Sequence, residues 1–213
     1  AYEHSDDSNG TFGETLHFIA GLHLEACRAA RTGGEALGAA LFELQMLDDW
    51  GFFDFEVYAP LLGRQGLARY RALAEKAWEK VPSLEPDDKR ESDGKRFLVT
   101  RIMEKLAGLD GDLDALVAVK SRDLSHAYAF LEIAQLLAKA ERHGDALALA
   151  ERARKAFPSE NDRRLVEFLV GAYRHAKRED EARALAWDHF DRSTSLAAYQ
   201  LLRNTCGARD WPA

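Results

Sequence analysis

Two residues near the start of the chain have the spacing of a metal-ligand pair. His23 and Cys27 are four positions apart, so on a helix they share a face and can reach one ion. His17 lies six positions before His23 and points to a different face. Because a zinc site takes three or four ligands, we predict no metal site here. We expect Cys27 to be a packed cysteine and His23 to lie at the rim of the core.

The second candidate for chemistry is a cluster of acidic residues around Gly51. Its members are Asp48, Asp49, Asp54 and Glu56. Carboxylates grouped in this way can hold a cation or act as an acid and base pair. They also accept hydrogen bonds from the free N–H groups at the starts of helices. The Asp-x-Asp-x-Asp-Gly spacing of a calcium loop is absent, so we expect helix caps.

The signatures of known enzyme classes are absent from the sequence. It has no phosphate-binding glycine loop, no Gly-x-Ser-x-Gly turn and no His-Glu-x-x-His motif. We therefore expect that the protein is not an enzyme and has neither a catalytic residue nor a cofactor. An enzyme that uses the acidic loop, residues 48–56, is the remaining catalytic alternative.

Basic residues form two groups that could contact the phosphates of a nucleic acid. They are Lys89, Arg90, Lys95, Arg96, Arg101 and Lys105, then Arg163, Arg164, Arg174, Lys177 and Arg178. Acidic residues are interleaved with the first group, a pattern typical of solvated helix faces. The chain carries 36 acidic and 29 basic side chains, which disfavours non-specific binding to nucleic acid or anionic lipid. Nucleic-acid binding is therefore the alternative to the hypothesis developed below.

Length, hydropathy and cysteine content indicate a soluble, cytoplasmic protein. The 213 residues are enough for a core without disulfide or metal. The longest uncharged stretches fall far short of the ~18 residues that cross a bilayer, so we expect no membrane segment. Cys27 and Cys206 are far apart and no secretory leader precedes them, which indicates a reducing compartment. The chain begins without methionine and ends in "DWPA", so we expect a piece of a longer polypeptide.

Hydrophobic periodicity predicts an all-α chain. Apolar residues recur at helical spacing along almost every periodic stretch, and none alternates as a strand does. Apolar stripes over 16–27 and 37–44 predict an antiparallel pair of helices. The segment "DDWGFFDFEVYAP" interrupts the pattern with Gly51 and ends at Pro60, so we predict a packed loop. All five prolines then stand at helix ends or in linkers.

A segment rich in proline and charge divides the chain. The stretch "PSLEPDDKRESDG" has the composition of a linker. We take 83–94 as the linker between an irregular N-terminal helical bundle, residues 1–82, and a region of helical repeats, residues 95–213. One continuous helical domain is the alternative.

The later part of the chain contains an internal repeat. "AERHGDALALA" begins at Ala140, and "AKREDEARALA" begins at Ala176. Two helices approach closely only where the facing side chains are small. We therefore predict that each copy is a helical hairpin whose alanines lie at the helix crossing, and that the two hairpins stack.

This arrangement resembles the tetratricopeptide repeat, whose unit is a pair of antiparallel helices of about 34 residues. The match is good over 127–160 and weaker over 163–194. In the weaker copy, Val170 and His189 stand where that family has small residues. The resemblance implies an α-α superhelix of antiparallel hairpins for this part of the chain.

A second resemblance covers nearly the whole chain. It is to an uncharacterised bacterial family of helical-repeat domains that lie C-terminal to SWIM-type zinc fingers. The segments that carry it include "LHLEACRAAR", "LFELQMLDDWGFFDF", "GLARYRALAEKAWEKVP", "DALVAVKSRDLSHAYAFLEIAQLL" and "ARDWPA". The resemblance implies that any zinc finger of the parent protein precedes Ala1, because this chain lacks the cysteine pairs that would form one.

The repeat resemblance also implies a binding surface. The first helix of each tetratricopeptide unit lines a concave groove. The corresponding residues are Tyr128, Leu131, Gln135 and Lys139 in one copy, and Arg164, Glu167, Arg174 and His175 in the next. We expect a protein or peptide, or another domain of the parent chain, to dock there, since aromatic and arginine residues dominate many interfaces.

Overall fold

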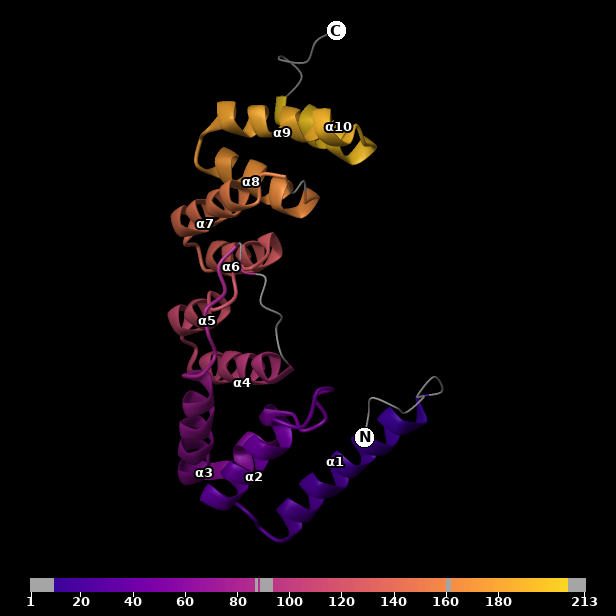
Figure 1. Ribbon diagram of the computed structural model, residues 1–213, viewed down its shortest axis with the longest axis vertical. Coiled ribbons are helices and arrows are strands. Elements are labelled where there is room, and N and C mark those ends of the chain that lie inside the picture. The colour runs from indigo at the N-terminus through magenta and orange to yellow at the C-terminus, as the bar shows by residue number, and fades with distance from the viewer. Residues whose placement is uncertain (1–9, 87, 89–93, 160–161, 207–213) are drawn as a thin grey trace. The chain divides into compact units, whose positions relative to one another are not determined.

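The computed structural model is all-helical, as the periodicity predicts (Figure 1). It describes residues 10–86, 88, 94–159 and 162–206, and within them the only extended pairing is an isolated bridge between Leu84 and Asp123. Most of the lead-in "AYEHSDDSNG", the terminal "ARDWPA", and Lys89 and Arg90 lie outside the described residues. None of the described helices is long and apolar enough to cross a bilayer.

The described residues form two compact units. The first contains α1 to α4 and nearly all of α5: Thr11–Ala29, Gly34–Gln45, Phe55–Trp78, Gly94–Asp110 and Leu113–Lys120. The second contains α6 to α10: Ala127–Lys139, His143–Ala156, Arg163–His175, Glu179–Ser193 and Leu196–Cys206. The start of the expected linker belongs to the second unit, where the Leu84 N–H donates to the Arg122 carbonyl at 2.9 Å. Helix α4, which we expected with the repeats, packs against α3 in the first unit.

Helices α2 and α3 cross at glycine. A Cβ atom added to Gly38 would lie 2.2 Å from the Gly66 carbonyl oxygen, and one added to Gly66 would lie 2.6 Å from the Gly34 oxygen. No side chain fits between these two backbones. The crossing therefore requires glycine at both Gly38 and Gly66, a role that periodicity of apolar residues does not reveal.

The prediction of a loop up to Pro60 is wrong for residues 55–60, which are helical. Helix α3 begins at Phe55, because the Asp54 carboxylate accepts the Glu56 N–H at 3.1 Å and caps the helix. Pro60 lies inside this helix and cannot donate to the ladder. The helical path breaks three residues later at Gly63, whose φ of 59° needs glycine.

The core of the first unit forms around Tyr70. Its ring stacks on Phe55 at a centroid distance of 5.0 Å and meets the edge of Phe42 at 6.3 Å. Leu41 and Leu62 are buried in the same cluster. Helices α2, α3 and α4 thus share one apolar centre.

The repeated alanines lie inside helical hairpins. Helix α6 packs with α7, and α8 packs with α9. Ala146, Ala150 and Ala153 of the first hairpin and Ala182 and Ala186 of the second are all buried. The pairing of the helices into two hairpins is confirmed, and the burial of the alanines agrees with their predicted place at the helix crossings.

His189 stands at a small-residue position of the second hairpin. Its side chain is buried on α9. Burial lowers the pKa of the imidazole, because the charged form loses hydration inside the fold. The departure from the repeat pattern therefore places a neutral, titratable group in the interior.

We predict that Ala150→Leu lowers the free energy of unfolding by about 1–3 kcal/mol, because a larger side chain at the crossing forces α6 and α7 apart. Ala148→Leu is the matched control, since Ala148 is exposed on the same helix and should change that free energy by less than about 0.5 kcal/mol. Urea denaturation followed by circular dichroism measures both. Equal effects of the two substitutions would contradict the buried crossing.

We also predict that the free energy of unfolding falls as the pH is lowered from about 6.5, the unperturbed histidine pKa. In that range the unfolded chain binds a proton at His189 that the folded chain, with its lowered pKa, does not bind. His189→Gln should make the fall with pH shallower. Urea midpoints at several pH values test this, and parallel curves for the two proteins would show that His189 makes no contribution.

Candidate functional site

The acidic loop is held closed by its own carboxylate. Asp48 is buried and accepts two backbone N–H groups, from Gly51 at 2.8 Å and from Phe53 at 2.7 Å. Gly51 has a φ of 82°, a left-handed conformation that glycine adopts at low cost. Arg101 on α4 donates to the Asp48 backbone oxygen at 2.7 Å. These contacts fasten residues 48–53 to the helices on either side.

The other acids of the cluster also have structural partners or face solvent. Asp54 caps α3, and Glu56 forms an ion pair with Lys105 that raises the pKa of the lysine. Asp49 is exposed. Among the residues that the structure describes, no three His, Cys, Asp or Glu side chains gather as a metal site. The expectation that these acids cap helices is confirmed for Asp54, whereas Asp48 accepts N–H groups within the loop itself.

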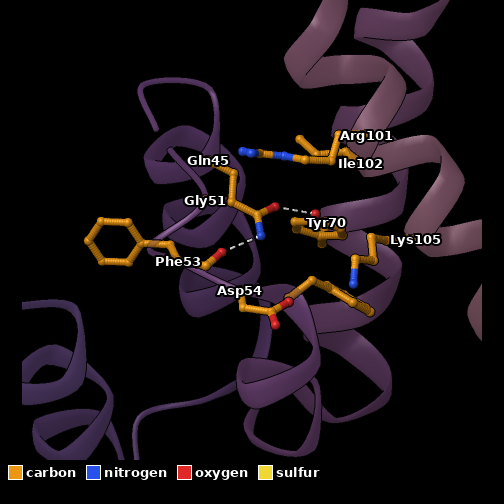
Figure 2. Close-up of a pocket in the computed structure, with 9 residues that line it drawn as sticks. Gln45, Gly51, Phe53, Asp54, Tyr70, Arg101, Ile102 and Lys105 are labelled. Carbon is orange, nitrogen blue, oxygen red and sulfur yellow. Dashed lines mark hydrogen bonds between the residues drawn. The ribbon is translucent and has the colours of Figure 1, made fainter. Parts of the chain in front are cut away.

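A pocket of about 190 Å³ lies beside this loop (Figure 2). Figure 2 shows Gln45 between two partners: its amide N–H donates to the Phe53 carbonyl at 2.6 Å, and its oxygen accepts from the Tyr70 hydroxyl. Burial raises the pKa of Tyr70 well above its usual range, so the phenol remains a donor at neutral pH. Arg101 and Lys105 line the opposite side and are engaged by Asp48 and Glu56. The polar groups around this pocket therefore hold the loop in place.

His23 and Cys27 belong to a packed aromatic cluster. The His23 Nδ1 atom lies 2.8 Å from the Tyr58 hydroxyl, and both ring nitrogens lie 3.9–4.0 Å from the Cys27 sulfur. Phe53 meets the imidazole edge-on at 5.9 Å. Burial, with a smaller contribution from Cys27, raises the pKa of Tyr58 to about 12. Cys27 is buried and His23 half-buried, as predicted for a packed cysteine and a histidine at the rim.

The expected groove residues of α6 fall into two groups. Gln135 and Lys139 are exposed and line one depression of about 290 Å³ together with Lys120 and Glu132. Leu131 is 1% exposed and belongs to the core. The expectation that Leu131 lines the groove is therefore wrong, because that position of α6 faces the interior of the unit.

A second depression, the α6–α8 depression, contains two expected residues of α8. Glu167 and His175 line it, and its volume is about 290 Å³. Its walls are mostly apolar: Ala138, Ala146, Phe168, Gly171 and Ala172. Three helices, α6, α7 and α8, contribute to it. Small side chains thus leave a hollow where the hairpins meet.

Sequence reasoning missed a histidine at this depression. The His143 ring, at the start of α7, lies 4.0 Å from the His175 ring between centroids. His143 is not among the eight expected groove residues. The contact joins the start of one helix to the end of another, so only the packing of α7 on α8 reveals it.

The remaining expected residues lie near the helix ends. Tyr128 is 42% exposed, and the Arg164 guanidinium stacks over its ring at 4.7 Å. Arg174 is exposed and lies 3.8 Å from the Glu179 carboxylate. The eight predicted residues are thus divided among two depressions, an arginine–tyrosine contact, an ion pair and the core.

Five of the nine described basic residues that were considered for nucleic-acid binding contact acidic side chains. Carboxylate partners lie within 4.0 Å of Lys105, Arg163, Arg164, Arg174 and Arg178. Arg96 is buried and donates to the Pro82 carbonyl at 2.6 Å. These contacts lower the positive charge available to phosphates.

Comparison with known protein families identifies the family of this chain. A family model described as a family of unknown function, DUF6880, matches residues 1–204. The chain belongs to this family. No curated protein matches the chain. Membership in DUF6880 confirms the resemblance to an uncharacterised family.

For this DUF6880 member we predict that Asp48→Ala lowers the free energy of unfolding by about 1–3 kcal/mol, because it leaves two backbone N–H groups without their acceptor. Asp49→Ala, which removes an exposed carboxylate, should change it by less than about 0.5 kcal/mol. Thermal melts with and without Mg²⁺ or Ca²⁺ complete the test. A metal-dependent rise in melting temperature that Asp48→Ala removes would favour a cation site in the loop.

Proposed function

We propose that this chain is a non-enzymatic scaffold that binds a segment of protein on its second unit. The proposal includes a tetratricopeptide-like stacking of hairpins. It is supported by the buried alanines of two successive hairpins and by the match of 127–160 to the repeat pattern. Hairpin stacks of this kind act by presenting surface, not by positioning a reacting group.

The α6–α8 depression is the observation that carries the proposal. Apolar side chains line most of it, and Glu167, His143 and His175 supply polar groups at its edge. Such a combination suits an apolar side chain of a bound segment, with hydrogen bonds that fix its orientation. Its size suits one or two anchor side chains of a docked helix or extended peptide.

The partner class we propose is a protein or peptide segment, including another domain of the parent chain. The resemblance to domains that lie C-terminal to SWIM zinc fingers supports another domain of the parent chain as the partner. A cytoplasmic setting is part of the proposal and is supported by two free, buried cysteines, Cys27 and Cys206.

Nucleic-acid binding is the alternative function. The acidic partners of the arginines on α8 weigh against it, as does the net charge of -7. Salt dependence separates the two: phosphate contacts lose affinity steeply with salt, whereas an apolar anchor does not.

An enzymatic role for the acidic loop is not part of the proposal. Asp48 and Asp54 accept backbone N–H groups, and Glu56 pairs with Lys105. A general base needs a free lone pair directed at substrate, and these carboxylates are directed at the protein itself.

We predict that Gly171→Trp weakens peptide binding by at least ~10-fold, because the indole would fill the α6–α8 depression. A Cβ atom at Gly171 would meet nothing within 4 Å, so the change should leave the fold intact. Peptides are selected from a random display library against the wild-type chain, and their affinities are measured by fluorescence polarisation at two salt concentrations.

Ala148→Trp is the control for this test, since it adds an indole to an exposed position of α7 outside the depression. It should keep wild-type affinity. The pair Lys139→Glu and Arg174→Glu, which reverses two exposed charges on α6 and α8, should weaken binding of acidic peptides. Unchanged binding by both Gly171→Trp and the charge-reversed protein would remove this face from consideration.

A further inference from the structure

The α6–α8 depression carries different polar groups at its two ends. Glu167 and His175 both line it, and His175 comes eight positions after Glu167 on α8. Eight helical residues span about 12 Å along the axis. Between the two, Phe168, Gly171 and Ala172 form the apolar wall that α8 contributes. A segment bound in the hollow therefore meets imidazole at one end and carboxylate at the other.

The imidazole end consists of two rings in contact. The His143 ring lies 4.0 Å from the His175 ring between centroids, with an angle of 40° between the ring planes. His143 is the first residue of α7 and His175 the last of α8, so the pair joins two successive hairpins. Both residues are exposed, so a bound partner can reach the rings.

Two imidazoles this close do not both become charged without a cost. Histidine is the side chain that gains its proton between about pH 8 and pH 5. The two charges would repel, so the second proton of such a pair binds less readily than the first. A carboxylate beside both rings offsets this repulsion and accepts a hydrogen bond from each of them. The pair is thus suited to hold a carboxylate.

The acids around the pair do not supply that carboxylate. The charged residues on the surrounding helices and turns are Lys139 on α6, Glu141 and Arg142 in the next turn, Asp145 on α7, Arg163, Glu167 and Arg174 on α8, and Lys177, Arg178 and Glu179 at the start of α9. Three of the four acids, Asp145, Glu167 and Glu179, form ion pairs with arginines. Over the residues that the structure describes, no carboxylate forms an ion pair or hydrogen bond with either imidazole of the pair.

We propose that the α6–α8 depression selects a protein segment that carries an acidic residue about one helical turn from its apolar anchor. The carboxylate binds at the His143–His175 pair, and the anchor fills the hollow beside Gly171. Gly171 lies four positions before His175, about 6 Å along the axis, which sets the spacing of the two groups. This inference rests on the proposed function and specifies its partner.

Binding of such a segment takes up a proton. The bound carboxylate favours the charged imidazole, so the complex holds a proton that the free chain lacks in the range where histidine titrates. Affinity therefore rises as the pH falls from about 7.5 to about 5.5. It declines again only where the carboxylate of the partner is itself protonated, near pH 4 or below, at about the unperturbed pKa of Asp and Glu.

Peptides selected from a random display library against the wild-type chain at about pH 5.5 test the proposal. The tightest binders should carry Asp or Glu near an apolar residue. Fluorescence polarisation should show at least ~3-fold tighter binding at about pH 5.5 than at about pH 7.5, the size expected of an exposed ion pair. Replacing the acid of the peptide by its amide should remove this gain. Circular dichroism at both pH values monitors the fold.

The double variant His143→Gln and His175→Gln should bind the acidic peptide equally at the two pH values, because glutamine remains polar but gains no charge. Both positions are exposed, so the fold should be retained. His17→Gln is the matched control, since His17 is an exposed histidine of α1 that does not line the depression. It should keep the pH dependence of the wild-type chain.

The possible results separate this inference from the proposed function. An equal gain at low pH for the amide peptide, or for the double variant, would overturn the carboxylate site. An affinity gain on adding Zn²⁺ at about pH 7.5 that the double variant abolishes would assign the pair to a metal instead. Peptides that bind without pH dependence would overturn only the choice of an acidic partner, whereas a library that yields no binder would overturn the proposed function as well.

Discussion

The close approach of helix backbones at small residues is the constraint on which this fold depends. In the second unit, buried alanines such as Ala150 and Ala186 allow the two helices of each hairpin to pack closely. In the first unit, Gly38 and Gly66 allow α2 and α3 to come closer still, with no room for a Cβ atom. Larger residues around these crossings then determine the relative positions of the packed helices, since a closely packed interior allows few other arrangements. Four of the eight residues that line the hollow between α6, α7 and α8 are alanine or glycine, and their small side chains leave space there.

In the first unit, the buried and ion-paired side chains that could take part in a reaction instead stabilise the fold. A buried carboxylate requires hydrogen-bond donors, and Asp48 accepts hydrogen bonds from two N–H groups of its own loop. Arg101 joins the same loop to α4, and Gln45 links it to Tyr70 on α3. One irregular segment is thus fixed by three helices. Residue types that suggest catalysis in the sequence serve here as the polar frame of a tight turn.

The α6–α8 depression differs in character from the pocket beside the acidic loop, where the polar side chains contact one another. The α6–α8 depression is concave, with histidines and a carboxylate at its edge, and suits one or two side chains of a partner. This hollow is the surface on which the proposed binding function rests.

The sequence by itself determined the helical class, the two hairpins and the burial of the repeated alanines, because periodicity and residue size act locally. It also indicated that acids around Gly51 cap helices, which Asp54 does. Only the tertiary structure decided that Leu131 faces the interior, that α4 packs in the first unit, and that His143 meets His175. These outcomes depend on which neighbour covers each helix face, and spacing along one helix carries no information about its neighbour.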